Sequence, residues 1–467
     1  MQEKRGERQN KSFIPVLPQI KISRISSAPK SRHQFHIIVY CSFMFARSIV
    51  LTGGFLLIGY FSLAQGYQHF YNEAKKALEE KRYPEFYTLI KKANALHPYH
   101  QTILWYAGMA AALNEKPDES IGFLTKALNI NTGYNLDDPN LNSIRALPAF
   151  QQLIRLKEKL SQAVIHSDTG FLIQDRQLHL ESVAFDPVDN ALYGGSIRKR
   201  KIIKINDKGV VSDFTLPEKY GMGSIFGLRV DAKKRILWAC SSAIPEMQHY
   251  DSTLASGLFQ FDLKTGMMVK MCRPLDTLSN HIFGDLVLDS RGIPYASDSK
   301  NNVIYKYDPI RSELHPYYSS KEFWSIQGLC FSDDDNLLYI ADYIKGIFML
   351  DVKKMELSKV NVPYDLSLKG TDGILFYKNS LITIQNGVQP NRVVRHFLDA
   401  SGKSFTRYEY VDNAHPAFGE PTIGSLNNNT LFYVANSQWS AYEDGRIKDP
   451  AELHPIVILK NVLKEEK

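Results

Sequence analysis

Residues 327–343 have the sequence QGLCFSDDDNLLYIADY. It combines a short apolar segment, a polar turn of Asp and Asn residues, and a second apolar segment, which is the pattern of a β-hairpin. Aspartate and asparagine favour such turns because their side chains bond to the turn's own backbone. The segment therefore predicts two antiparallel strands.

The same unit occurs six times within residues 168–463. Its first strands are LESVAFD (180–186), FGLRVD (226–231), GDLVLD (284–289), QGLCFS (327–332), DGILFY (372–377) and EPTIGSL (420–426). Equivalent positions follow one another at intervals of 45, 58, 43, 45 and 48 residues. A blade of four antiparallel strands needs about this length, and roughly 4–8 blades close a ring without exposed sheet edges. The sequence thus predicts a mainly β protein with a six-bladed β-propeller.

Residues 65–166 follow a different period. Two segments align when the chain is shifted so that Ala74 falls on Gly108, and the helix-opening prolines Pro84 and Pro117 recur at nearly the same spacing. This self-similarity resembles tetratricopeptide repeats, whose period is about 34 residues, and predicts a small all-α domain. Its function can be to dock a protein partner or only to pack and oligomerise, and the sequence leaves both open.

The N-terminal residues hold all of the net charge. Residues 1–64 carry nine Lys or Arg and two Glu, which accounts for the whole charge of +7. A neutral remainder has no electrostatic footprint for nucleic acid, so that class of partner is excluded.

The apolar run IVLTGGFLLIGYFSL (49–63) follows Arg47 and ends at the small residue Ala64. This pattern predicts a signal peptide over residues 44–64, cleaved after Ala64, behind a basic leader (1–43) that is disordered or a mis-annotated start. We expect a secreted or periplasmic protein with no stable membrane span after cleavage. An uncleaved signal anchor is the alternative.

Several motifs resemble the senescence marker protein/gluconolactonase family, which has paraoxonases, diisopropyl fluorophosphatases and strictosidine synthases as distant relatives. The motifs are LESVAFD, FGDLVLDSRGIPYASDS, QGLCFSDDDNLLYIADY, TDGILF, ITIQNGVQPNRVVR and HPAFGEPTIG, and they span most of residues 168–440. The resemblance implies a central pocket that holds a divalent cation, usually calcium, and hydrolyses a lactone or related ester. Strictosidine synthase-like members use the same propeller for non-hydrolytic chemistry without that metal.

The resemblance also implies a ligand set. The family's Glu ligand falls on Glu181 and its Asp ligand falls on Asp372. Gln327 replaces one Asn ligand, while Gly284 replaces another and brings no oxygen. Glu420 of the sixth unit supplies a further carboxylate. The expected metal ligands are therefore Glu181, Gln327, Asp372 and Glu420, which with water can satisfy calcium's preference for about 6–8 oxygens.

A hydrolase of this kind also needs a general base to activate water. The expected catalytic residues are Asp372 and His281, with His249 and His415 as weaker candidates. We expect the following residues to line the substrate pocket: Phe226, Asp285, Asp298, Asp342, Asn386 and Asn436. If the carboxylates converge without a cation, they must repel one another, and at least one should hold a proton near neutral pH.

Two functional hypotheses follow. The first is an exported, metal-dependent hydrolase that acts on a small-molecule substrate, and the retained Glu181 and Asp372 favour it. The second is a non-catalytic propeller that binds a small molecule or a protein partner, with the helical repeats as the docking module. Gly284 in place of an Asn ligand favours the second.

Overall fold

The structure is a computed structural model that describes residues 66–276 and 280–464. The predicted leader and signal peptide fall outside these residues. In the part of the chain that the structure describes, no helix is long and apolar enough to cross a membrane.

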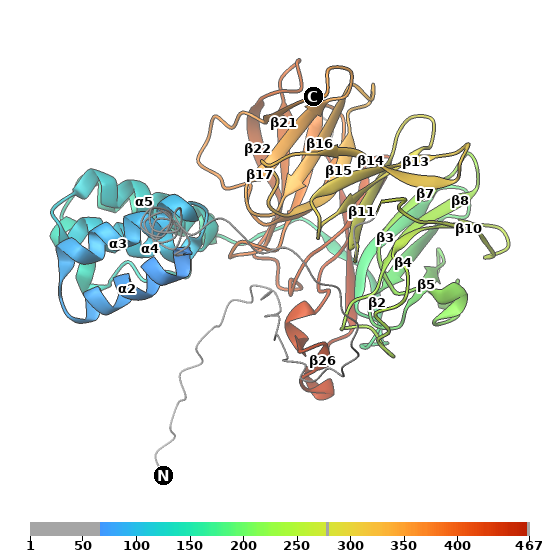
Figure 1. Ribbon diagram of the computed structural model, residues 1–467, viewed down its shortest axis with the longest axis horizontal. Coiled ribbons are helices and arrows are strands. Elements are labelled where there is room, and N and C mark those ends of the chain that lie inside the picture. The colour runs from blue at the N-terminus through green and yellow to red at the C-terminus, as the bar shows by residue number, and fades with distance from the viewer. Residues whose placement is uncertain (1–65, 277–279, 465–467) are drawn as a thin grey trace, which may run out of the picture. The chain divides into compact units, whose positions relative to one another are not determined.

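The β part consists of six antiparallel sheets, numbered here as blades in chain order (Figure 1). Five of them have four strands each, and blade 5 has a short fifth strand, β1 (Val164–Ile165), at its outer edge. Blade 1 consists of β3 (Leu180–Asp186), β4 (Ala191–Ser196), β5 (Lys201–Ile205) and β6 (Val211–Asp213). Blade 2 consists of β7 (Ser224–Asp231), β8 (Ile236–Ser242), β9 (Gly257–Asp262) and β10 (Met268–Cys272). Blade 3 consists of β11 (Phe283–Leu288), β12 (Pro294–Asp298), β13 (Val303–Asp308) and β14 (Glu313–Ser319). Blade 4 consists of β15 (Ile326–Phe331), β16 (Leu337–Asp342), β17 (Gly346–Asp351) and β18 (Glu356–Lys359). The main strands of blade 5 are β19 (Thr371–Phe376), β20 (Ser380–Gln385), β21 (Arg392–Leu398) and β22 (Phe405–Asn413). Blade 6 consists of β23 (Gly424–Asn427), β24 (Thr430–Val434), β27 (Ile456–Val462) and β2 (Asp168–Ile173).

Two features close these sheets into a ring. The innermost strands contact one another in the order β3, β7, β11, β15, β19, β23 and back to β3. The last blade takes its outermost strand, β2, from the other end of the propeller segment, and β2 pairs with β27 from Asp168 opposite Lys460 to Ile173 opposite Ile456. The predicted six-bladed propeller is confirmed.

The innermost strands approach one another so closely that some positions exclude any side chain. A Cβ on Gly227 would lie 2.7 Å from the Cα of Asp285 in the next blade. A Cβ on Gly328 would lie 2.6 Å from the carbonyl oxygen of Asp372. Contacts this short do not occur for real Cβ atoms, so glycine at these positions is what lets the blades meet around the axis.

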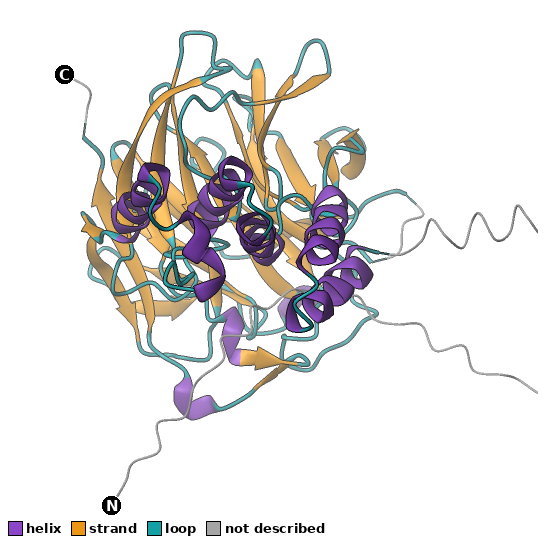
Figure 2. Cartoon of the chain, turned by 90° about the vertical axis from the view of Figure 1, so that its left-hand side faces the viewer, coloured by secondary structure: helices purple, strands orange, loops and turns teal. Residues whose placement is uncertain are grey.

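The helices form a separate group that precedes the strands in the chain (Figure 2). They are α2 (Tyr67–Glu79), α3 (Tyr83–Leu96), α4 (Gln101–Leu113), α5 (Pro117–Ile130), the 3-10 helix η1 (Pro139–Ile144) and α6 (Pro148–Ser161). The α4 helix is buried over most of its length. Gly108 of α4 lies against Leu124 of α5, because a Cβ there would come within 2.6 Å of the Leu124 side chain. A small residue is thus needed at one of the two positions that the repeat aligned, while the assignment to tetratricopeptide repeats stays a prediction.

Gly328→Ala should destabilise the propeller by about 1–3 kcal/mol, the usual cost of overpacking. The added methyl group would collide with the backbone of β19, which cannot move without displacing blade 5. Gly122→Ala is the matched control, because a Cβ at Gly122 of α5 meets nothing within 4 Å and alanine favours a helix. Urea unfolding followed by circular dichroism measures both variants, and equal stability of Gly328→Ala and wild type would contradict the close approach of the blades.

Candidate functional site

The candidate site lies where the innermost strands begin, and β-bulges define it. The pairing register of the first two strands shifts at Glu181 in blade 1, at Gly284 in blade 3 and at Asp372 in blade 5. In blades 2 and 4 it shifts across two-residue segments, 226–227 and 327–328. A bulge leaves the extra residue unpaired and redirects its side chain, and bulges are common beside active sites. Five of the residues that the repeat alignment singled out therefore share one structural position.

Glu181 is the more buried of the two acids at the bulges, with 6 % of its surface exposed. Its Oε2 accepts a hydrogen bond of 2.8 Å from the indole Nε1 of Trp439. Burial, followed by the nearby charge of Asp372, raises the pKa of the Glu181 carboxyl well above its usual range.

Asp372 is only partly buried and shares the same electrostatic environment. Its Oδ2 accepts a hydrogen bond of 2.9 Å from the Asn386 side-chain amide. Burial raises the pKa of Asp372 to about 7, the Asn386 amide opposes this rise, and the charges of Asp285 and Glu420 add to it. In the described part of the chain, neither Glu181 nor Asp372 forms an ion pair with a Lys or Arg side chain.

The sixth blade departs from the predicted alignment. Ile423 pairs with Ser182 of blade 1 in a parallel bridge, so the residue equivalent to Glu181 is Thr422 rather than Glu420. The Thr422 hydroxyl donates to the carbonyl oxygen of Glu181 at 2.7 Å. Glu420 lies two residues earlier, and its Oε2 accepts a hydrogen bond from the backbone N–H of Ser440. Glu420 therefore holds a loop while its charge still reaches the pocket.

The other two predicted positions at the bulges differ in what they contribute. The Gln327 amide donates from Nε2 to the Ser325 hydroxyl at 3.3 Å, and its Oε1 would lie 3.4 Å from a Cβ placed on Gly284. Asp285, which follows Gly284, is 1 % exposed and forms an ion pair of 3.1 Å with Arg229. Arg229 thus balances part of this charge within the propeller wall, while the charge still contributes to the raised pKa of Asp372.

Three of the predicted pocket residues instead secure loops of their own blades. Asp298 accepts hydrogen bonds from the backbone N–H groups of residues 282, 300 and 301, and Asp342 accepts them from residues 324, 325, 344 and 345. The Asn436 amide bonds to the backbone of residues 455 and 457. Asn386 occupies the equivalent position in blade 5, and its side chain contacts Asp372 instead.

His281 is enclosed by acids rather than directed at Asp372. Its Nδ1 lies 2.8 Å from Asp298 and its Nε2 lies 3.3 Å from Asp276. Both ring nitrogens of His281 therefore face these two carboxylates rather than the acids at the bulges. His249 pairs with Glu218, and His415 bonds to the backbone of residues 167 and 417.

Sequence reasoning missed two aromatic residues at the site. Trp439 lies in the 3-10 helix η3 (Trp439–Ala441), within the segment between β24 and β27, and its ring stacks with that of Phe226 at 6.3 Å. Tyr343 donates from its hydroxyl to Oδ1 of Asn386 at 3.0 Å. Neither position recurs among the six units, so the repeat pattern carried no signal for them.

Glu181, Asp372 and Gln327 all offer oxygen atoms, which are the ligands that a hard cation such as calcium prefers. Two of the three are acids without a basic partner, so a cation would balance their charge. Within residues 66–276 and 280–464, however, no three side chains of Asp, Glu, His or Cys come together closely enough to hold an ion. A cation here would therefore depend on two carboxylates, one amide oxygen, and water or substrate oxygens.

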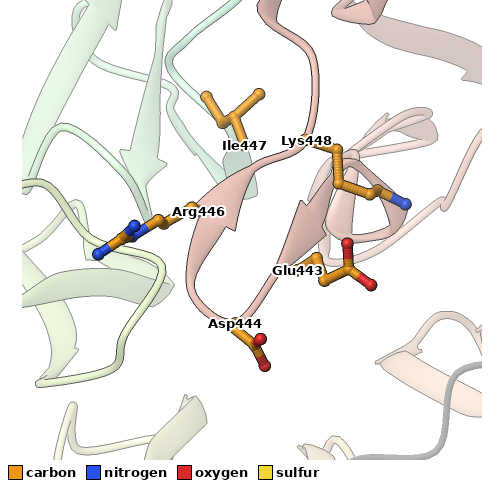
Figure 3. A pocket seen from close by; sticks show the side chains of 5 residues that line it. All are labelled: Glu443, Asp444, Arg446, Ile447 and Lys448. Carbon is orange, nitrogen blue, oxygen red and sulfur yellow. The ribbon is translucent and has the colours of Figure 1, made fainter.

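A hollow of about 490 Å³ lies elsewhere, beside the hairpin of β25 (Tyr442–Glu443) and β26 (Arg446–Ile447) (Figure 3). Its lining residues are Glu443, Asp444, Arg446, Ile447 and Lys448. Two acidic and two basic side chains line it, and all of its lining residues come from this short segment. It contains none of the residues predicted from the sequence.

Comparisons with known proteins give no family. No protein-family model matches the sequence, and no curated protein matches it. Among solved structures, the aldose sugar dehydrogenase of Streptomyces coelicolor is 13 % identical with a TM-score of 0.45, and the match covers 64 % of this chain and 98 % of that one. A gluconolactonase of Xanthomonas campestris is 13 % identical with a TM-score of 0.44, covering 64 % and 97 %. At this level of similarity the matches assign no chemistry to this chain.

The stability of the wild-type protein should fall as the pH rises from about 4 to 8 in the presence of a chelator. Asp372 binds its proton more tightly in the folded than in the unfolded chain, so its contribution is complete below the ordinary carboxyl pKa of about 4 and is lost as the pH passes its raised value. Asp372→Asn removes this cost and should be the more stable protein at pH 8, by on the order of 2 kcal/mol.

Thermal melts at constant ionic strength across this pH range measure the effect. Asp207→Asn, at an exposed turn, is the control for the loss of one charge and should follow wild type. A melting profile of Asp372→Asn parallel to that of wild type would show that the carboxyl carries no such cost.

Proposed function

We propose that the axial pocket is the active site of a hydrolase that opens a lactone or related ester with water, and that a divalent cation, most simply calcium, balances its two carboxylates. The observation that carries the proposal is the pair Glu181 and Asp372, two enclosed acids on different blades without a basic partner. Such a pair costs stability, and strongly perturbed acids in a protein are candidates for functional groups. That the protein is exported remains a prediction from the sequence of its N-terminal segment.

The roles of the residues follow from their contacts. The Asn386 amide holds the Asp372 carboxylate in one orientation through Oδ2. Asp372 takes a proton from the attacking water as the water oxygen bonds to the substrate carbonyl carbon. The same proton then passes to the ring oxygen as the carbon–oxygen bond breaks, which leaves a hydroxy acid. Asp372 is therefore the general base and then the general acid.

Glu181, Asp372 and Gln327 are the residues that would hold the cation. A bound divalent cation polarises a carbonyl group and lowers the pKa of a bound water molecule. Glu181 contributes negative charge and is itself oriented by the N–H of Trp439. The aromatic rings of Trp439 and Phe226 form an apolar side of the pocket, which suits the carbon skeleton of a small organic substrate.

Calcium should raise the melting temperature of the wild-type protein in a concentration-dependent manner. Binding to the folded state alone adds about 2.7 kcal/mol at a ligand concentration 100 times the Kd. Asp372→Asn should lose this response, because it removes one of the two carboxylates, whereas Asp207→Asn should keep it. If calcium, magnesium, manganese and zinc all leave the wild-type melting temperature unchanged, the cation is not part of the site.

Hydrolysis is tested separately by titrating the acid released from a panel of aliphatic and sugar lactones. Asp372→Asn should lower kcat/KM by about 10²–10⁴-fold, the usual contribution of a general base. A wild-type protein that binds calcium but opens no lactone would instead be a non-catalytic binding propeller. Phe226 and Gly284, which bring no oxygen to the ring, favour that second function.

A further inference from the structure

The loop between β20 and β21, residues 386–391, belongs to the pocket at its first end. Asn386 donates to Asp372 and accepts from Tyr343. The next residue, Gly387, has no room for a side chain: a Cβ there would lie 2.5 Å from the Cα of Gly370 and 2.7 Å from the ring of Tyr343. The backbone N–H groups of Asn386 and Gly387 both donate to the carbonyl oxygen of Gly370. This end of the loop is therefore packed directly against residue 370 and the Tyr343 ring, so that a displacement of the loop is transmitted to Asn386.

The middle of the loop belongs to the helical domain. Val388 is 5 % exposed and is part of the hydrophobic core formed by the helices. The Gln389 N–H donates to the carbonyl oxygen of Ile130, at the end of α5, and the Gln389 carbonyl oxygen accepts from the N–H of Thr132, both at 2.8 Å. A two-way backbone pairing and a buried valine thus fix the loop to the helices.

A buried arginine extends this connection. Arg392, the first residue of β21, is 2 % exposed. Its Nη2 donates to the carbonyl oxygens of Ser367 at 2.8 Å and Asn129 at 3.4 Å, and its Nε donates to Gln385 at 2.8 Å. One guanidinium group therefore bonds to the helical domain and to the strand that leads to Asn386.

Blade 5 differs in this respect from its neighbours. The equivalent side chains of blades 3, 4 and 6, those of Asp298, Asp342 and Asn436, bond to the backbone of their own blades. The Asn386 side chain bonds instead to two other side chains, and the loop behind it is held from outside the propeller.

We propose that the helical domain is a structural part of the pocket, and that it acts as a clamp on the loop 386–391 which positions Asn386 against Asp372. Ordering a loop costs conformational entropy, and the helices supply the contacts that offset this cost for residues 386–391. Asn386 is thus a positioning residue, and the helices serve the propeller from within the same chain. The consequence for catalysis rests on the proposed function, whereas the clamp itself does not.

Val388→Ala in the full-length protein tests the clamp, with Val434→Ala as its matched control. Val434 of β24 is fully buried, and the hydrophobic cluster in which it packs contains no residue of the segments 366–374 or 386–391. Hydrogen exchange followed by mass spectrometry, well below the melting temperature, should show faster exchange in Val388→Ala both in the loop and in residues 366–374. Val434→Ala should leave both segments at the wild-type rate. Wild-type exchange in residues 366–374 of Val388→Ala would overturn the proposal.

Kinetics test the positioning role. Asn386→Ala should lower kcat. Val388→Ala should lower kcat by about tenfold with little change in KM. This loss is smaller than the roughly 100-fold cost of a 1 Å misplacement, because Val388 acts on Asn386 only through the loop. The double variant should be no slower than Asn386→Ala, because both changes remove the same positioning. Additive losses would mean that Val388 acts by another route and would overturn the proposal. If the wild-type protein opens no lactone, the proposed function fails, and the exchange experiment alone decides whether the helices clamp the pocket.

Discussion

The whole structure depends on how closely six strands can approach a common axis. At Gly227 and Gly328 the backbone of the next blade occupies the place where a side chain would stand. The bulges occur beside the same positions, and they direct Glu181 and Asp372 out of the pairing pattern. The close packing of the inner strands closes the ring, and the bulges beside these contacts place the two acids. Both features therefore occur in the same short part of these inner strands.

The acids around the site differ in whether a partner balances their charge. Asp285 is paired with Arg229 and Glu420 is engaged by the backbone of residue 440, whereas Glu181 and Asp372 have only neutral donors. A propeller could remove this cost by replacing either acid with an apolar residue of similar size. Each of the two acids is instead held by one oriented hydrogen bond from a neutral donor, and this unbalanced pair is the observation on which the proposed function rests.

The six-blade repeat and the two axial acids were predictable because both depend on local patterns. Each hairpin is encoded within one short segment, such as residues 327–343, and Glu181 and Asp372 occupy the same position in their units. Glu420 was aligned wrongly, since the Pro421 that follows it cannot donate a backbone hydrogen bond and the strand pairs two residues later than in other blades. Asp276 beside His281 and the indole of Trp439 come from loop segments that no repeat describes.

The number of blades, and the residue at the inner bulge in five of the six units, followed from the sequence alone because turn chemistry and strand alternation act over short distances. Which of the polar side chains after the second strands bond to backbone, and which reach the site, depends on the tertiary structure: Asp298 and Asp342 bond to backbone, while Asn386 reaches Asp372. The tertiary structure also decided that helices far earlier in the chain hold the Asn386 loop. Such contacts depend on the three-dimensional closure of the ring, which brings together residues as distant in the chain as Asn129 and Arg392 and leaves no periodic trace in the sequence.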